Sequence, residues 1–262
     1  MIRSACGRLL SIAALALVSI AFPGTAAAQW SYKNPTTPRT PDGKADLKAP
    51  APRTPWGTID LSGVWQTDIK YNADLAADLK PGDVVMLPAG RALFDERQAN
   101  LAKDDPEGFC LAPGVPRVNG VPFPEKIIQT PASVVILYET RTTFRQIFLD
   151  AQHTLPGSPQ PTWMGYSKGH WDGDTLVVET TGFNGLTWLD DAGHPQSERG
   201  RVIERIRRPD FGHLLDEITI DDPAMYARPW TVTQEFRLDP DGELIEYVCG
   251  ENNRDIPHLV GK

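Results

Sequence analysis

Residues 165–181 read GYSKGHWDGDTLVVETT, two alternating runs on either side of an Asp-Gly pair. An Asp-Gly pair between such runs is typical of a tight turn that joins two antiparallel β-strands. With the turn placed between Trp171 and Asp174, counting outward pairs His170 with Thr175. The stretch therefore predicts a β-hairpin and, with it, an antiparallel sheet.

The two faces of this hairpin differ in character. Successive side chains of a strand point to opposite faces, so one face is small or apolar while the other carries Tyr166, Lys168, His170 and Glu179. In most sheets such a polar face is solvated. In a barrel with a ligand cavity it can instead point inward, which would place Tyr166, His170 and Glu179 in one site. Both alternatives stay open on the sequence alone.

Short runs with strand-like composition continue on both sides of the hairpin. Turn signals separate them, and from residue 125 onward no helical pattern lies between them to make a parallel crossover. They cover 61–65, 125–130, 132–139, 143–149, 163–171, 174–181, 201–208, 213–220, 230–238 and 243–249. One helix is expected over 88–103, while 24 Pro and 22 Gly in 262 residues disfavour a helical bundle. We expect a mainly β fold, an antiparallel barrel, calycin-like domain or sandwich with one or two short helices.

The first 28 residues have the three parts of a secretory signal peptide. Two arginines precede an apolar run over 9–22, and small residues lead to a cleavage site after Ala28. The apolar run is shorter than the roughly 20 residues that a permanent membrane span needs. We therefore expect a periplasmic or secreted protein with no permanent membrane span. In an oxidising compartment the two remaining cysteines, Cys110 and Cys249, are expected to form a disulfide.

A tandem repeat occupies most of the segment 29–60. Residues 38–47 read PRTPDGKADL and residues 52–61 read PRTPWGTIDL, with seven of ten positions identical. Two copies are too few for a solenoid, and the prolines predict an extended, polyproline-like arm. Residues 61–262 are then expected to form a single β-rich domain.

Charge and motifs exclude several classes of partner. The net charge is −8, and removal of the signal peptide leaves 24 basic against 34 acidic residues, or −10. Such a chain is a poor partner for nucleic acid. It has no nucleotide-binding glycine motif, and its five histidines lack the local spacing of metal ligands. We expect no metal, no cofactor, and a small apolar or aromatic molecule as partner.

One motif resembles the nucleophile elbow of serine hydrolases. Residues 165–169 match Gly-x-Ser-x-Gly, but an elbow needs a strand, a sharp turn and a helix. Here the motif lies within one arm of a hairpin, so Ser167 is not expected to be a nucleophile.

The segment 182–200 joins two predicted strands and is long for a hairpin connection. It contains Asp190 and His194, with Trp188 as an apolar anchor. Long connections of this kind are often lids or binding loops. The alternative is an ordinary solvated loop.

Five further motifs support a resemblance. They are LSGVW (61–65), CLAPGVPR (110–117), WDGDTLVVET (171–180), DPAMYARPWT (222–231) and YVCGEN (247–252). On these motifs the chain resembles an uncharacterised family of exported bacterial proteins. The resemblance implies export and a single domain, and it implies no particular reaction. Family members often have His where this chain has Gln196 and Gly250, so any chemistry that uses those histidines would be lost or altered here.

The first functional hypothesis is a binding protein. A small apolar or aromatic molecule would occupy the barrel, and the loop 182–200 would gate it. Tyr166 and Glu179 would fix the orientation of the ligand. Other candidate ligand-binding residues are the rings of Trp163, Phe183 and Trp188, and the polar Glu251 and Asn252 beside Cys249.

The second hypothesis is a cofactor-independent lyase, isomerase or hydrolase. His194 or His170 would act as the base, Asp190 or Glu179 would orient that base, and Tyr166 would donate to a developing oxyanion. A third alternative is an envelope scaffold tethered by the Pro-rich arm.

Overall fold

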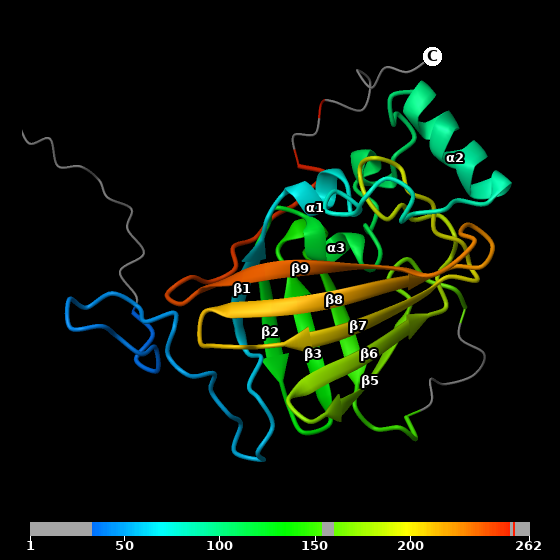
Figure 1. Cartoon of the computed structure of the whole chain (residues 1–262). Helices are drawn as coiled ribbons and strands as arrows, with labels where there is room; N and C mark the ends of the chain where they lie inside the picture. The colour runs from blue at the N-terminus through cyan, green and yellow to red at the C-terminus, as the bar shows by residue number, and fades with distance from the viewer. Residues whose placement is uncertain (1–32, 154–159, 252–253, 255–262) are drawn as a thin grey trace, which may run out of the picture. The chain divides into compact units, whose positions relative to one another are not determined.

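A computed structural model describes residues 33–153, 160–251 and 254. The predicted signal peptide lies outside the described residues. Nine strands of the described chain close into a barrel, because β9 pairs with both β8 and β1 (Figure 1). The strands are β1 (Gly63–Thr67), β2 (Glu125–Gln129), β3 (Ser133–Tyr138), β4 (Thr143–Phe148), β5 (Tyr166–Asp172), β6 (Thr175–Thr181), β7 (Arg201–Arg207), β8 (His213–Asp221) and β9 (Trp230–Asp239). The predicted mainly β barrel is confirmed.

Three short α-helices lie toward one end of the barrel, the upper end in Figure 1. They are α1 (Lys70–Ala73), α2 (Pro88–Ala99) and α3 (Arg117–Gly120). The helix expected over 88–103 is thus confirmed, although it ends four residues earlier. All four residues of α3 are buried, whereas α2 packs on the outside through its one buried residue, Gly90. No helix of the described chain has the length and apolar character needed to cross a membrane.

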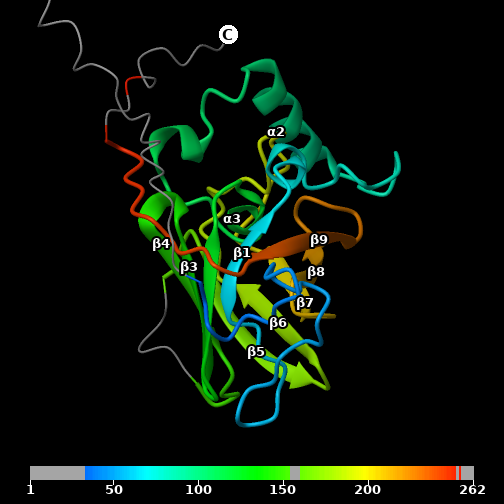
Figure 2. The ribbon, with the colours of Figure 1, turned by 90° about the vertical axis from the view of Figure 1, so that its left-hand side faces the viewer.

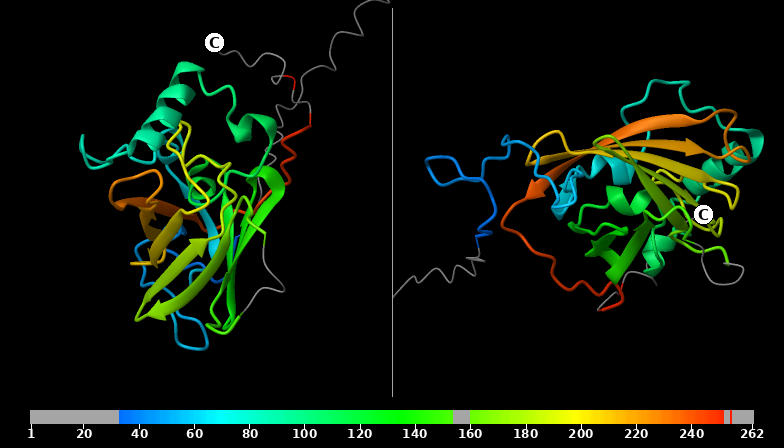
Figure 3. Two further views of the ribbon diagram at one scale, coloured as in Figure 1. Left: turned by 90° about the vertical axis from the view of Figure 1, so that its right-hand side faces the viewer. Right: turned by 90° about the horizontal axis from the view of Figure 1, so that it is seen from below.

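One pair of strands departs from the antiparallel expectation. β4 and β5 run parallel, while the other pairs around the barrel are antiparallel. Parallel neighbours need a connection of about a dozen residues or more, and the segment 149–165 between these strands is long enough. The right-hand view of Figure 3 looks along the barrel from below, with β7–β9 (yellow to orange) on one side and β2–β4 (green) on the other.

The strand expected over 243–249 does not form. Closure of the barrel is the physical reason, because a closed sheet leaves no free edge with which another strand could pair. Other contacts hold this segment. Cys249 forms the predicted disulfide with Cys110, and the backbone N–H of Ile245 donates to the carboxylate of Glu139 at 3.0 Å.

The register expected for the 165–181 hairpin is wrong by two residues. The turn residues are Gly173 and Asp174, so Asp172 pairs with Thr175 and His170 pairs with Val177. A shift of two residues leaves every side chain on its predicted face. The apolar face points into the barrel and the polar face points outward, as the burial pattern of both strands indicates.

The N-terminal arm is not an extended polyproline-like segment. Each copy of the repeat forms a tight turn, closed by a bridge between Arg39 and Ala45 in the first copy and between Arg53 and Ile59 in the second. The shared glycine of each copy has a positive φ, a conformation that favours glycine. The arm lies against the barrel (blue in Figure 2), where the N–H groups of residues 211 and 212 donate to carbonyls of residues 49 and 47.

Candidate functional site

A buried histidine–aspartate pair lies in the connection between β6 and β7. The Nδ1 atom of His194 is 2.6 Å from Oδ2 of Asp190, and the Asp190 side chain is fully buried. Backbone N–H groups hold the carboxylate in place: that of His194 donates to Oδ1 at 3.0 Å and that of Leu75 donates to Oδ2 at 2.8 Å. The sequence hypothesis offered two possible partners for His194, and the structure brings Asp190 to it.

Aromatic side chains fix the imidazole ring from two directions. The ring centroid of Phe94, on α2, lies 4.9 Å from that of His194. The ring centroid of Trp230, at the start of β9, lies 6.0 Å from that of His194. The ring of Tyr226 packs edge-on against Trp230, with 5.5 Å between the two ring centroids. Among the described residues, Nε2 of His194 has no hydrogen-bond partner. The imidazole is therefore oriented through Nδ1.

Asp74 brings a third group to within reach of the pair. Its Oδ1 lies 3.9 Å from Nδ1 of His194, and its side chain is about half-exposed. Asp74, Asp190 and His194 together could supply ligands to a metal ion. Two ligand atoms of a tetrahedral zinc ion lie about 3.3 Å apart, whereas Nδ1 and Oδ2 are 2.6 Å apart. A distance of 2.6 Å is that of a hydrogen bond between His194 and Asp190. A metal ion bound by both atoms would have to push them further apart.

An ion-pair network positions the connection that carries His194. The buried guanidinium of Arg117, on α3, pairs with Asp105, Glu107 and Asp191. Asp191 also accepts a hydrogen bond of 2.8 Å from the side chain of Asn72. Burial acts to lower the pKa of Arg117, but these carboxylates raise it above its ordinary value. The residue next to Asp190 is thus anchored to two helices.

The loop 182–200 is a packed part of this end of the barrel, so the alternative of an ordinary solvated loop is wrong. Most of its residues from 187 to 196 are buried. The side chains of Arg97 and Gln98, on α2, donate to carbonyls of Gly193 and Ala192 at 3.0 and 2.6 Å. The Arg97 guanidinium also lies 4.4 Å from the ring of Trp188. Burial lowers the pKa of Arg97 to about 10.

The polar residues of the 165–181 hairpin do not join this site. His170 and Glu179 are exposed on the outer face of the barrel, and Tyr166 is half-buried there. The Tyr166 hydroxyl donates to the carbonyl of Gln160 at 2.7 Å, and Glu179 lies 3.8 Å from Arg201. The inward alternative for this face is therefore wrong, because the small and apolar face occupies the interior.

The candidate ligand-binding residues do not gather in one place. Phe183 is fully buried in the hydrophobic core, and Trp188 is buried beneath Arg97. Trp163 is half-buried and Glu251 is exposed. Asn252 lies outside the described residues. The ring that contacts His194 most closely, Phe94, was not among the candidates, since a helix-surface phenylalanine carries no motif.

A second cluster, which the sequence reasoning missed, lies inside the barrel. Arg145 of β4 pairs through two nitrogens with the carboxylate of Glu204 on β7, and both side chains are buried. Burial acts to lower the pKa of Arg145, but Glu204 raises it above its ordinary value. Arg145 also donates to Ser167 and Thr180 at 2.9 and 2.7 Å. The guanidinium therefore links β4 to three further strands of the barrel, β5, β6 and β7.

Two further carboxyl groups face this pair. Burial raises the pKa of Glu125, on β2, to about 8. Burial, and secondly the charge of Glu204, raises the pKa of Asp216, on β8, well above its ordinary value. A sequence signal existed: Glu204 and Asp216 fall in the same alternating phase as the buried apolar residues of their strands. Residues in that phase point into the barrel, so the charged side chains of Glu204 and Asp216 indicate a polar interior.

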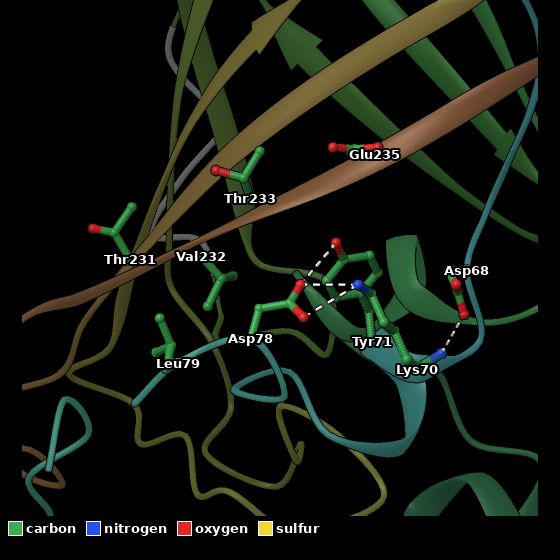
Figure 4. Close-up of a pocket in the computed structure, with 9 residues that line it drawn as sticks. All are labelled: Asp68, Lys70, Tyr71, Asp78, Leu79, Thr231, Val232, Thr233 and Glu235. Carbon is green, nitrogen blue, oxygen red and sulfur yellow. Dashed lines mark hydrogen bonds and ion pairs between the residues drawn. The ribbon is translucent and has the colours of Figure 1, made fainter. Parts of the chain in front are cut away.

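A groove on the outside of the barrel is a weaker candidate (Figure 4). It has a volume of about 430 Å³ and lies between the outer face of β9 and the segment that contains α1. Its lysine, Lys70, already pairs with Asp78 at 3.0 Å, and both side chains are about half-exposed. The lysine of this groove therefore offers no strongly desolvated charge to a ligand.

The fold and the site together define a closed β-barrel protein with a buried histidine–aspartate pair at one end. No family model matches the chain, and no curated protein or solved structure matches it either. The resemblance to exported bacterial proteins therefore stays a prediction.

Proposed function

We propose that this protein is an exported, cofactor-independent acid–base enzyme that acts on a small organic molecule, with His194 as the catalytic base. The observation that carries the proposal is the 2.6 Å contact between Nδ1 of His194 and the fully buried carboxylate of Asp190. A histidine oriented by a buried carboxylate acts as the catalytic base in many hydrolases, lyases and isomerases. The sequence hypothesis of an acid–base enzyme thus gains support at one of its two candidate histidines.

The geometry supports a definite division of roles. Asp190 accepts the Nδ1–H hydrogen bond and so leaves Nε2 as the basic nitrogen. In the reaction, Nε2 takes a proton from a water molecule or from a substrate carbon, and Asp190 stabilises the imidazolium that forms. The same proton then passes to the leaving group or to the product. Phe94 and Trp230 border the imidazole, which favours a substrate with an apolar part.

Export is supported by the disulfide between Cys110 and Cys249. Structural disulfides persist mainly in oxidising compartments, such as the periplasm or the extracellular space. The expected signal peptide points to the same location.

An apolar ligand in the barrel, the first sequence hypothesis, has less support. The described interior holds Arg145 together with Glu125, Glu204 and Asp216, and an apolar molecule would leave such groups without partners. A gating role for the loop 182–200 stays a prediction.

The test compares His194→Gln with His213→Gln. His213 also contacts an aspartate, Asp210, at 2.7 Å, but this pair is partly exposed, so it is a matched control. Hydrolysis of p-nitrophenyl acetate and related small esters is followed for both variants. We expect His194→Gln to lose about a hundredfold in turnover, and His213→Gln to match the wild type.

A second test needs no substrate: ¹⁵N NMR shows which ring nitrogen of His194 carries the proton. We expect the proton on Nδ1 in the wild type, and a mixture of tautomers in Asp190→Asn. Full turnover in folded His194→Gln, or a wild-type proton on Nε2, would contradict the proposal.

A further inference from the structure

Among the described residues, the interior of the barrel brings three acidic side chains, Glu125, Glu204 and Asp216, around one guanidinium, that of Arg145. Arg145 makes both of its ion-pair contacts with Glu204, and its remaining hydrogen bonds go to the hydroxyls of Ser167 and Thr180. The side chains of Glu125 and Asp216 are buried in the same interior. Neither has an ion pair with a described cation. A cation could therefore take the place of the protons that these buried carboxyl groups hold at neutral pH.

Hydrogen-bonding groups are also left without partners at one place in this interior. Asp216 of β8 and Gln234 of β9 are directly opposite each other in the antiparallel pairing, so their side chains lie on the same, inward face. Both are at most 1% exposed. Among the described residues, Oδ1 of Asp216 and both Oε1 and Nε2 of Gln234 have no hydrogen-bond partner. Native proteins rarely leave a complete buried amide unpaired.

Burial, and secondly the nearby charge of Glu204, keeps the pKa of Asp216 well above its ordinary value. Glu204 in turn accepts from the Nδ2 group of Asn119, on α3, at 3.1 Å. In this cluster Oδ1 of Asp216 is an acceptor without a described partner. The unpaired set therefore comprises two acceptors and one donor on adjacent strands.

We propose that the barrel interior beside Asp216 and Gln234 binds a small organic cation that has an ammonium group and a neighbouring oxygen atom. The ammonium group donates to Oδ1 of Asp216 and Oε1 of Gln234, and its binding releases the proton that a buried carboxyl group otherwise holds, so the charge stays balanced inside the barrel. The oxygen of the ligand accepts from Nε2 of Gln234. A bare metal ion would leave that N–H donor unpaired, and an anion would find no unpaired cation in the described interior, because Arg145 is already paired with Glu204.

The architecture is consistent with a small occupant. A barrel of eight strands is just wide enough to be filled by its own side chains or to hold one small ligand, and this barrel has nine. The proposed site is separate from His194, so it is independent of the proposed acid–base function.

Ethanolamine is the probe for the test, because at pH 7 it carries an ammonium group and a hydroxyl oxygen. Calorimetric titration of the disulfide-bonded protein, at constant ionic strength, compares it with ethylamine, ethylene glycol and calcium chloride. We expect saturable binding of ethanolamine, binding at least about tenfold weaker for ethylamine, which lacks the oxygen, and none for ethylene glycol, which lacks the charge.

Two variants remove the proposed contacts, and each has a neighbouring control that points outward. Asp216→Asn and Gln234→Leu are each expected to weaken ethanolamine binding about tenfold or more. Glu217→Gln and Glu235→Gln, one residue further along the same strands, are expected to bind as the wild type does. If Asp216→Asn does not fold, Gln234→Leu decides alone, since it introduces no new polar group.

Three results would overturn the proposal. The first is no saturable heat with ethanolamine, which would mean that water alone satisfies these groups. The second is equal binding by Gln234→Leu and the wild type. The third is calcium binding that excludes ethanolamine, which would make the cluster a metal site.

Discussion

Replacing Arg145 with methionine is expected to destabilise the folded protein by about 3–5 kcal/mol. The guanidinium is the positive partner of the buried Glu204 carboxylate, and it also donates to Ser167 and Thr180. Methionine keeps much of the side-chain volume but removes every donor. The variant therefore leaves a buried carboxylate and two hydroxyls without their main partner. Urea unfolding at pH 7, with the disulfide intact, measures the difference in free energy of unfolding.

The control for this variant is Arg205→Met, one strand position from Glu204 on the outer face. Arg205 pairs with Asp172 at 3.0 Å, and both side chains are largely solvated. Exposed pairs of this kind contribute about 0–1 kcal/mol. A double variant, Arg145→Met with Glu204→Gln, should recover part of the loss because it removes the unpaired charge. Equal effects of Arg145→Met and Arg205→Met would show that the buried pair has no special energetic role.

The strand pattern was largely readable from the sequence because it depends on local alternation. The faces of the 165–181 hairpin are correct even though its register is wrong by two, since only an odd shift exchanges the faces. The turn position itself could not be chosen, because Asp172-Gly173 and Gly173-Asp174 are both acceptable turn pairs. Local rules thus determine which side chains go inward, but not which residues meet.

Closure of the barrel could not be predicted in the same way. The segment 243–249 has a strand-like composition, yet β1 occupies the edge of β9 that it would need. The pairing partners β1 and β9 are separated by most of the chain, so no local signal reports their contact. The parallel pairing of β4 with β5 is a similar consequence of the path that the chain takes between them.

The same distinction between local signals and distant contacts applies to the candidate site. His194 and Asp190 are four residues apart in one loop, and the sequence could propose them as a pair. Their environment comes from distant segments: Phe94 from α2, Trp230 from β9, and the N–H of Leu75 from the residues after α1. The buried cluster around Arg145 also joins residues that are distant in the sequence, at separations of 22 to 59 residues. Its charged residues were readable as inward-facing, but their mutual contacts were not.

The stability of the protein is expected to fall as pH rises from about 4.5 to about 8. Burial raises the pKa of Glu125 from 4.5 to about 8 in the folded protein. Between these two values the folded state keeps a proton that the unfolded state has lost, so raising the pH favours unfolding. At pH 7 this difference costs about 3 kcal/mol, at about 1.4 kcal/mol for each pH unit above 4.5. Asp216 acts in the same direction, since burial raises its pKa too.

Glu125→Gln isolates the contribution of Glu125, because glutamine has the same shape and no charge to desolvate. The variant is expected to match the wild type at pH 4, where Glu125 is neutral in both states, and to be more stable by about 3 kcal/mol at pH 7. Urea unfolding at each pH unit from 4 to 8 measures both curves. Glu235→Gln, exposed on the outer face of β9, should follow the wild-type curve throughout. Parallel curves for Glu125→Gln and the wild type would mean that Glu125 is already ionised in the folded barrel, with a cation or water beside it.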